Sequence, residues 1–195
     1  MRPTELSETH QLRLVRESDA SELAALIDAN RMHLAQWLPW AAANRVEDTR
    51  QFLRQAVRQH ADDNGFQAAI VRVGPRPRIV GVIGFHVIQW PHRWTSLGYW
   101  MEAAEQGHGT MTRAVRAMVE HAFGTWELNR IEIRAATDNH RSRAIPERLG
   151  FRQEGTLRQV ERVGGRFLDH AVYGLLAEEW SALATRTGEA TPGSR

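Results

Sequence analysis

Apolar positions that alternate with polar ones, or that form short continuous runs, mark seven segments of strand length in this chain. Segments of this kind, bounded by Gly or Pro, are typical of β-strands. Turn residues at 74–78 and at Gly164 and Gly165 join two pairs of these segments, so each pair is predicted to be a hairpin. The predicted strands are residues 11–16, 66–73, 79–90, 95–102, 130–135, 151–163 and 166–176.

Apolar positions that recur every three or four residues predict helices between these strands. Asp19 with Glu22 forms a capping-box-like start for the first helix, and Gly150 is a stop signal for the fourth. Pro146 falls inside that fourth helix and is expected to kink it or to shorten its regular part. The predicted helices are one that begins at Asp19, residues 46–61, a segment that follows two glycines and ends at residue 123, residues 139–149, and residues 178–184.

The middle of the chain reads as strand, glycine loop, helix and strand, which predicts a parallel strand pair with a right-handed crossover. Ligands of open α/β sheets bind at the carboxyl ends of parallel strands, which here lie beyond Glu102 and Ala136. After Glu102, Gly107 and Gly109 let the backbone approach a ligand, and unpaired N–H groups at the helix start favour an anion such as pyrophosphate. A tight connection without a ligand is the alternative for these glycines.

Residues 106–111, with the sequence Gln-Gly-His-Gly-Thr-Met, resemble the acetyl-CoA pyrophosphate loop of the GNAT N-acetyltransferase superfamily. Met111 departs from the Gly or Ala that ends this pattern, but a Met there is usual in the RimJ/RimL branch. The resemblance to that branch covers roughly residues 12–180, and it also rests on residues 97–100, 139–144 and 149–151. It implies an α+β GNAT fold, with a mixed central sheet of about seven strands that is flanked by helices and splayed at the acetyl-CoA site.

The resemblance and the length together predict one domain. A chain of 195 residues is long enough for a single sizeable core. We expect the N-acetyltransferase domain at residues 11–184, an N-terminal extension at residues 1–10, and a disordered tail at residues 185–195, which are small and polar.

The resemblance also implies catalytic roles. In RimL-like enzymes the matching asparagine contacts the pantetheine arm and the matching serine protonates the departing thiolate, which assigns these roles to Asn139 and Ser142. Their spacing alone favours an ordinary first-turn serine and a capping asparagine. Glu161 is the implied base, and a surface ion pair with its flanking arginines is the ordinary alternative. Glu102, at the end of the key strand, is the rival base.

The expected acetyl-CoA site combines backbone groups at the end of one strand, the glycine loop with the first turn of its helix, and the start of the next helix. Its residues are Trp100, Met101, Gln106, Gly107, His108, Gly109, Thr110, Met111, Thr112, Asn139 and Ser142. Acetyl-CoA is the expected co-substrate. No metal is expected, because the nine histidines show no metal-ligand spacing.

Composition narrows the chemistry further. The sequence contains no cysteine, which excludes disulfides, thiolate metal sites and a cysteine nucleophile. All 25 basic residues are arginine, which excludes a Walker-type lysine and a Schiff-base lysine. The net charge is +2 without a run of basic residues, so no nucleic-acid partner is expected. No apolar run approaches the roughly 18 residues that span a bilayer, so we expect a cytoplasmic protein without a membrane partner.

The expected activity is acetyl transfer to a primary amine, directly in a ternary complex. A protein N-terminus is the expected acceptor, a small amine or aminoacyl compound is the alternative, and a non-catalytic acyl-CoA-binding module is the rival class. Arg50, Arg54 and Arg58 form a stripe that suits either a solvated surface or an acidic partner. Residues 37–40, Trp-Leu-Pro-Trp, are either a core plug or a wall of the substrate cleft. Related enzymes are often homodimers, and the hairpin 151–176 offers an edge for pairing.

Overall fold

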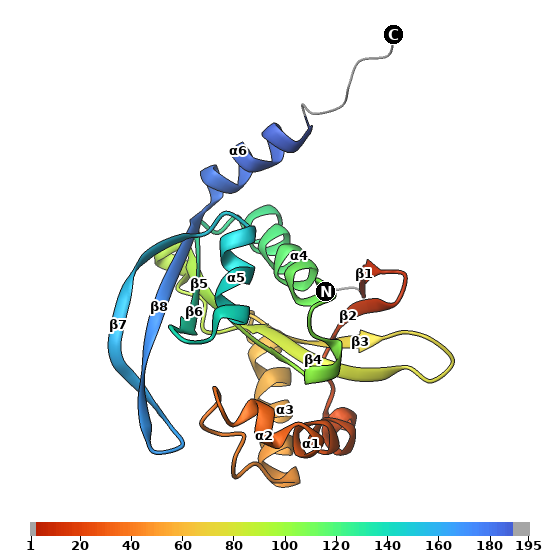
Figure 1. The fold of residues 1–195 in the computed structure, drawn as a ribbon. Coiled ribbons are helices and arrows are strands. Elements are labelled where there is room, and N and C mark those ends of the chain that lie inside the picture. Colours follow the sequence, from red (N-terminus) through yellow and green to blue (C-terminus); the bar gives the residue numbers. More distant parts are fainter. Residues whose placement is uncertain (1–2, 189–195) are drawn as a thin grey trace.

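A computed structural model describes residues 3–188 of the chain. Eight strands form one sheet in the order β1-β2-β3-β4-β5-β6-β8-β7 (Figure 1). All neighbouring strands are antiparallel except β5 and β6, which are parallel. The strands are β1 Thr4–Ser7, β2 His10–Leu14, β3 Gln67–Arg72, β4 Arg78–Phe85, β5 Trp94–Met101, β6 Arg130–Ala136, β7 Arg152–Val163 and β8 Arg166–Leu176.

Helices pack on both faces of this sheet. On one face α4 and α5 cover the larger apolar cluster, which includes Met118, Ile131 and Tyr173. On the other face α1 and α3 cover a second cluster, which includes Leu23 and Leu53. Figure 1 shows these two layers on opposite sides of the sheet, with the β7–β8 hairpin reaching out to one side. The α-helices are α1 Ala20–Ala29, α2 Arg31–Leu34, α3 Val46–Ala61, α4 Thr110–Gly124, α5 His140–Arg148 and α6 Ala177–Gly188, and the short 3-10 turns are Glu17–Asp19, Trp90–His92 and Ala103–Glu105.

The α+β class, the mixed sheet flanked by helices and the parallel crossover β5–α4–β6 are as predicted. The helix of this crossover forms because Met111, Val115 and Met118 recur on one face, where all three are buried against the sheet. None of the helices between residues 3 and 188 is long and apolar enough to cross a bilayer.

The sheet has one strand more than the seven predicted. Strand β1 lies within residues 1–10, which we expected to be an extension of the domain, and it pairs with β2 and packs against α4. Of its four residues only Leu6 is buried. A strand this short and polar shows no alternation in the sequence, which is why the pattern missed it.

Two predicted boundaries are wrong. The strand predicted at residues 79–90 ends at Phe85, because the chain then loops through the 3-10 turn Trp90–His92 to Arg93, whose φ of 52° is left-handed. The last helix continues to Gly188, four residues beyond its predicted end. The rest of the predicted tail, residues 189–195, lies outside the described part of the chain.

Aromatic rings close the core at the end of α4. The ring of His121 lies edge-on to Trp126, with centroids 4.6 Å apart, and to Phe66 at 5.2 Å. Burial lowers the pKa of His121, and the nearby charge of His60 lowers it further. The neutral imidazole is therefore the form that the folded protein favours.

Because the pKa of His121 is lowered, the free energy of unfolding decreases as the pH falls. In the unfolded chain a histidine titrates near its ordinary value of about 6.5, so below that pH the unfolded state binds the proton more tightly. The contribution of His121 is present above this value and is lost as the pH falls toward the lowered pKa. We expect His121→Phe to show a smaller fall in melting temperature than wild type between pH 7.5 and pH 5.5, measured by thermal denaturation.

His92→Gln is the matched control, because His92 is exposed and lies outside the aromatic cluster. It should keep the wild-type slope of melting temperature against pH. If His121→Phe and His121→Gln both keep the wild-type slope of melting temperature against pH, His121 is not the group that causes this pH dependence.

Candidate functional site

Strands β5 and β6 are paired along only part of their length. Paired residues run from Trp94 with Arg130 to Leu97 with Ile133, while β4 stays paired with β5 to its end at Met101. Beyond the last β5–β6 pair, both strands continue without pairing to one another. The sheet is therefore splayed, as predicted, at the carboxyl ends of its two parallel strands, where ligands of open α/β sheets bind.

Backbone groups at the end of β5 face this gap. Glu102 N donates to Val80 O, at the β4 side of the strand. Successive residues of a strand direct their N–H and C=O groups to opposite sides. Tyr99 and Met101 therefore direct theirs toward the gap, whereas the N–H of Trp100 is directed toward β4.

The glycine loop lies between β5 and α4. Gly107 has a φ of 86° and Gly109 a φ of 72°, both in the left-handed region that disfavours a side chain. A Cβ built on Gly107 would meet no atom within 4 Å, so the chain leaves open space beside this residue. Glycine is thus needed at position 107 for its backbone conformation, and the space beside it is available to a ligand.

The first turn of α4 presents free N–H groups at the end of this loop. Arg113 N donates the first hydrogen bond of the helix, so the N–H groups of Thr110, Met111 and Thr112 precede the helical ladder. Their side chains are engaged elsewhere, because Met111 is buried in the core, the Thr110 hydroxyl accepts from Arg113, and the Thr112 hydroxyl accepts from Arg148. These residues can hold an anion through their backbone, helped by the helix dipole.

Gln106 links the two helical layers beside the loop. Its Oε1 accepts from Arg141 Nη1 of α5 at 2.9 Å, and its Nε2 lies 2.8 Å from His33 Nε2 of α2. Burial, and then the charge of Arg141, lower the pKa of His33. The neutral ring nitrogen of His33 therefore accepts the amide N–H of Gln106.

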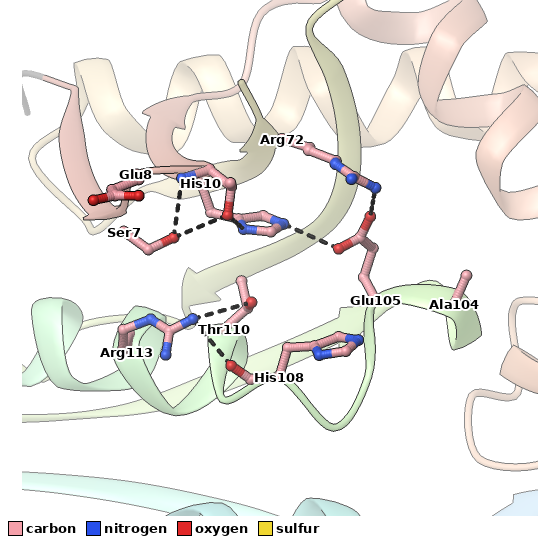
Figure 2. Close-up of a pocket in the computed structure, with 10 residues that line it drawn as sticks. Ser7, Glu8, His10, Arg72, Ala104, Glu105, His108, Thr110 and Arg113 are labelled. Atoms are coloured by element: carbon pink, nitrogen blue, oxygen red, sulfur yellow. Dashed lines mark hydrogen bonds and ion pairs between the residues drawn. The ribbon is translucent and has the colours of Figure 1, made fainter. Parts of the chain in front are cut away.

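A cavity of about 560 Å³ lies beside the loop, between the β1–β2 turn and the start of α4 (Figure 2). The Glu105 carboxylate lines it and is bonded to His10 Nε2 at 3.1 Å and to Arg72 Nη1 at 2.9 Å. Burial would raise the pKa of Glu105, but the hydrogen bonds from Arg72 and His10 lower it below its ordinary value. These bonds anchor the residue before the loop to β2 and β3. His108 lines the same cavity, and its carbonyl accepts from Arg113 at 3.1 Å.

Ser142 lies beside the gap, in contact with the unpaired end of β5. Its Oγ donates to the Tyr99 hydroxyl at 3.3 Å, and that hydroxyl donates to the Ser142 carbonyl at 3.1 Å. Burial raises the pKa of Tyr99, so its phenol keeps the proton that it donates. Asn139 Oδ1 accepts from Ser142 N at 3.1 Å and caps α5. The sequence analysis missed Tyr99, because a strand residue gives no sign of a contact 43 residues away.

Glu161 lies on β7, and its ion-pair partner is not one of the flanking arginines. Glu161 Oε2 is 3.2 Å from His170 Nε2 of β8, while the guanidinium of Arg162 lies over the ring of Phe167. His170 is paired with Ala136, the last residue of β6. The pair of Glu161 and His170 therefore lies at the carboxyl end of β6, and His170 is a second residue that the sequence analysis missed.

Glu102, the rival base, is held in an ion pair. Its Oε1 lies 2.5 Å from Arg78 Nη1, and only 10% of its side chain is exposed, against 34% for Glu161. A buried carboxylate with a paired guanidinium is costly to separate from its partner. Glu161 is therefore the more accessible of the two carboxylates.

Both tryptophans of the Trp-Leu-Pro-Trp loop pack against the sheet or its hairpin. Trp37 packs on a small apolar cluster that includes Ala136, at the end of β6. Trp40 is 41% exposed and lies edge-on to Trp100 of β5, with ring centroids 6.0 Å apart. The loop therefore fills a corner of the core, and its prediction as a wall of the substrate cleft stays a prediction.

The arginine stripe of α3 is partly neutralised. Arg50 and Arg54 both contact Glu47, at 3.2 Å and 2.9 Å, and these hydrogen bonds lower the pKa of that carboxylate. The stripe therefore gives little support to an acidic partner on this face. Among residues 3–188 no group of three or more His, Asp or Glu side chains is arranged to hold a metal ion.

The chain matches the Acetyltransferase (GNAT) domain family over residues 11–152, so it belongs to the GNAT acetyltransferases, as the loop and the splayed sheet predicted. YdaF of Bacillus subtilis (strain 168), named as a candidate ribosomal N-acetyltransferase, is 37% identical over 174 residues, which are 87% of this chain and 92% of YdaF. The ribosomal-protein-serine acetyltransferase of Escherichia coli (strain K12) is 31% identical over 169 residues, 86% of this chain and 93% of that one. The predicted membership of the RimJ/RimL branch is confirmed.

Solved structures agree with this. RimL, a ribosomal L7/L12 α-N-protein acetyltransferase in complex with coenzyme A, superposes with a TM-score of 0.84 at 26% identity, covering 91% of this chain and 99% of RimL. The microcin C7 self-immunity acetyltransferase MccE, in complex with acetyl-CoA and AMP, superposes with a TM-score of 0.81 at 26% identity, covering 88% of this chain and 94% of MccE. The chain is thus a GNAT N-acetyltransferase that shares its fold with RimL and MccE.

The glycine loop gives a direct test. Gly107→Ala forces a side chain into a left-handed conformation, at a cost of about 1–2 kcal/mol, and moves the backbone that faces the open space. We expect it to weaken acetyl-CoA binding about tenfold, because a shift of about 1.4 kcal/mol changes a dissociation constant by that factor. Isothermal titration calorimetry measures the change.

Gly165→Ala is the matched control. Gly165 has a φ of 84° and equally open surroundings, but it lies in the β7–β8 turn. It should lower the melting temperature as Gly107→Ala does and leave acetyl-CoA affinity at the wild-type value. Equal losses of affinity in both variants would show that the loop has no special role.

Proposed function

We propose that this protein transfers the acetyl group of acetyl-CoA to the α-amine of a protein N-terminus, directly in a ternary complex. The observation that carries the proposal is the gap between β5 and β6, which has the Ser142 hydroxyl beside it and the glycine loop at the end of β5. The open space at Gly107 and the free N–H groups of α4 fit a pyrophosphate. The relatives named for ribosomal proteins support a protein acceptor.

Each step of the transfer has a candidate group in this chain. Acetyl-CoA, when bound, supplies the acetyl group as a thioester. The Met101 N–H, directed toward the gap, donates to the thioester carbonyl and stabilises the charge that develops there. The side chain of Asn139 caps α5 and keeps Ser142 at the helix start, and it would contact the pantetheine arm when acetyl-CoA is bound.

Two side chains handle the protons. Glu161, held by His170, takes a proton from the amine as its nitrogen bonds to the carbonyl carbon, directly or through water. Ser142 gives its hydroxyl proton to the sulfur as the carbon–sulfur bond breaks. The proton lost by the amine balances the one gained by the sulfur, once solvent has restored both side chains.

The strength of this base favours an N-terminal acceptor. An α-amine has a pKa of about 7.7–8.0 and is partly neutral at cellular pH, whereas a lysine amine near 10.4 is almost fully protonated. A carboxylate is only a modest base. It therefore suits an α-amine better than a lysine side chain.

A small amine or aminoacyl compound is the second candidate acceptor, and the likeness to MccE favours it. A non-catalytic acyl-CoA-binding module is disfavoured, because Ser142 and Glu161 are both present with defined partners. Free-thiol production from acetyl-CoA separates the three, with N-terminal peptides, small amines and aminoacyl nucleotides as acceptors. Turnover with peptides supports the proposal, turnover with the small compounds alone replaces the acceptor, and binding without any turnover identifies a binding module.

Ser142→Ala should separate binding from chemistry. We expect kcat to fall about a hundredfold, because general-acid assistance contributes about 10²–10⁴-fold, while the dissociation constant of acetyl-CoA stays at its wild-type value. The control is Ser181→Ala, whose hydroxyl donates to Ala177 O within α6 and which should keep full turnover. Unchanged kcat in Ser142→Ala would remove this serine from the mechanism.

Glu161→Gln should lower kcat by about 10²–10⁴-fold, because glutamine has nearly the same shape and accepts no proton. Glu120→Gln, an exposed change on α4, is the control and should retain wild-type kcat. Glu102→Gln tests the rival base. A larger loss of kcat in Glu102→Gln than in Glu161→Gln would transfer the role to Glu102.

A further inference from the structure

Pro146 removes the helical hydrogen bond that the carbonyl of Ser142 would otherwise accept. In an α-helix the N–H of each residue donates to the carbonyl four residues earlier. The carbonyl four residues before Pro146 is that of Ser142, and both residues lie within α5. Proline has no N–H, so this carbonyl has no helical partner at that position.

The Tyr99 hydroxyl occupies the place of the missing donor. It donates to the Ser142 carbonyl at 3.1 Å, and its oxygen accepts the Ser142 hydroxyl at 3.3 Å. Tyr99 comes from the end of β5 that has lost its pairing with β6. Pro146 of α5 therefore leaves the Ser142 carbonyl without a helical donor, and Tyr99 of β5 supplies a donor from the other side of the gap.

We propose that Pro146 and Tyr99 are positioning residues for Ser142, in which the proline leaves the Ser142 carbonyl open to the tyrosine and the tyrosine oxygen then fixes the serine hydroxyl beside the gap. The proposal rests on the proposed role of Ser142 as proton donor. Tyr99 acts through Ser142 and gives up no atom. As Ser142 passes its proton to sulfur, the Tyr99 O–H turns from the carbonyl to the serine oxygen and stabilises it by a hydrogen bond.

Other contacts hold the start of α5 without help from Pro146. Arg143 Nε donates to the Tyr173 hydroxyl at 2.8 Å, and Arg143 Nη1 donates to Thr137 O at 2.9 Å. Asn139 caps the helix. Pro146 is buried, so its replacement removes ring contacts as well as changing the partner of this carbonyl, while the contacts of Arg143 and Asn139 still hold the start of the helix.

The test is Pro146→Ala, which restores an N–H four residues after Ser142. The higher helix propensity of alanine offsets the ring contacts that the buried proline loses, so we expect a melting temperature close to that of wild type. The new N–H competes with Tyr99 for the carbonyl, so we expect kcat to fall about tenfold, the worth of one hydrogen bond in the transition state, with KM for acetyl-CoA unchanged. Pro91→Ala, an exposed change in the 3-10 turn Trp90–His92, is the control and should leave kcat unchanged.

A double-mutant cycle with Tyr99→Phe tests whether the proline acts through the tyrosine. In the Tyr99→Phe background, Pro146→Ala should cause no further loss of kcat. An equal loss in both backgrounds, or full kcat in Pro146→Ala, would overturn the proposal.

Hydrogen exchange gives a readout that does not need Tyr99→Phe to fold. A protected amide at position 146 in the alanine variant, together with reduced kcat, supports the proposal. Reduced kcat with a freely exchanging amide overturns it. Failure of the proposed function is seen separately, as wild-type kcat in Ser142→Ala or as no turnover by the wild-type protein.

Discussion

The site depends on one interruption in the sheet, where β5 and β6 stop pairing while the chain keeps both strands extended. Backbone groups that would bond across two parallel strands are left facing a gap, and such groups are costly unless a partner reaches them. The flanking pairs β4–β5 and β6–β8 continue past this point, so the strands on either side hold the gap open. In the proposed function the substrate supplies the missing partner.

Backbone groups without a partner also occur at the two helices that border the gap. The first N–H groups of α4 have no acceptor among residues 3–188, because every helix begins with unpaired N–H groups, and the glycine loop leaves space in front of them. In α5 the unpaired group is a carbonyl, left over by a proline, and a tyrosine from the sheet reaches it. One end of the domain thus concentrates backbone groups that lack a partner of their own secondary structure.

Helices and strands with a strong periodic pattern could be predicted from the sequence. The helix Val46–Ala61 and the strand Arg166–Leu176 have their predicted bounds, because strong periodicity and Gly-Gly turn chemistry act over a few residues. The glycine loop could be located because its residue types carry their own conformational meaning. The contacts of Tyr99 with Ser142 and of Glu161 with His170 could not, since they join different elements whose approach is set by the packed fold. Pro146 was visible in the sequence only as a disturbance of a helix, because the donor that makes it useful lies on a strand.

None of the basic side chains that anchor the site is a lysine. Glu105 is bound by His10 and Arg72, Glu102 by Arg78, and Gln106 by Arg141, and the chain contains no lysine at all. Lysine amines are the side chains that acetylation neutralises. In the proposed function, the acetyl thioester therefore meets no side-chain amine of this protein that it could modify. Its ion pairs would keep their charge however long acetyl-CoA stays bound. Because the chain has no lysine, it has no side-chain amine that could be acetylated.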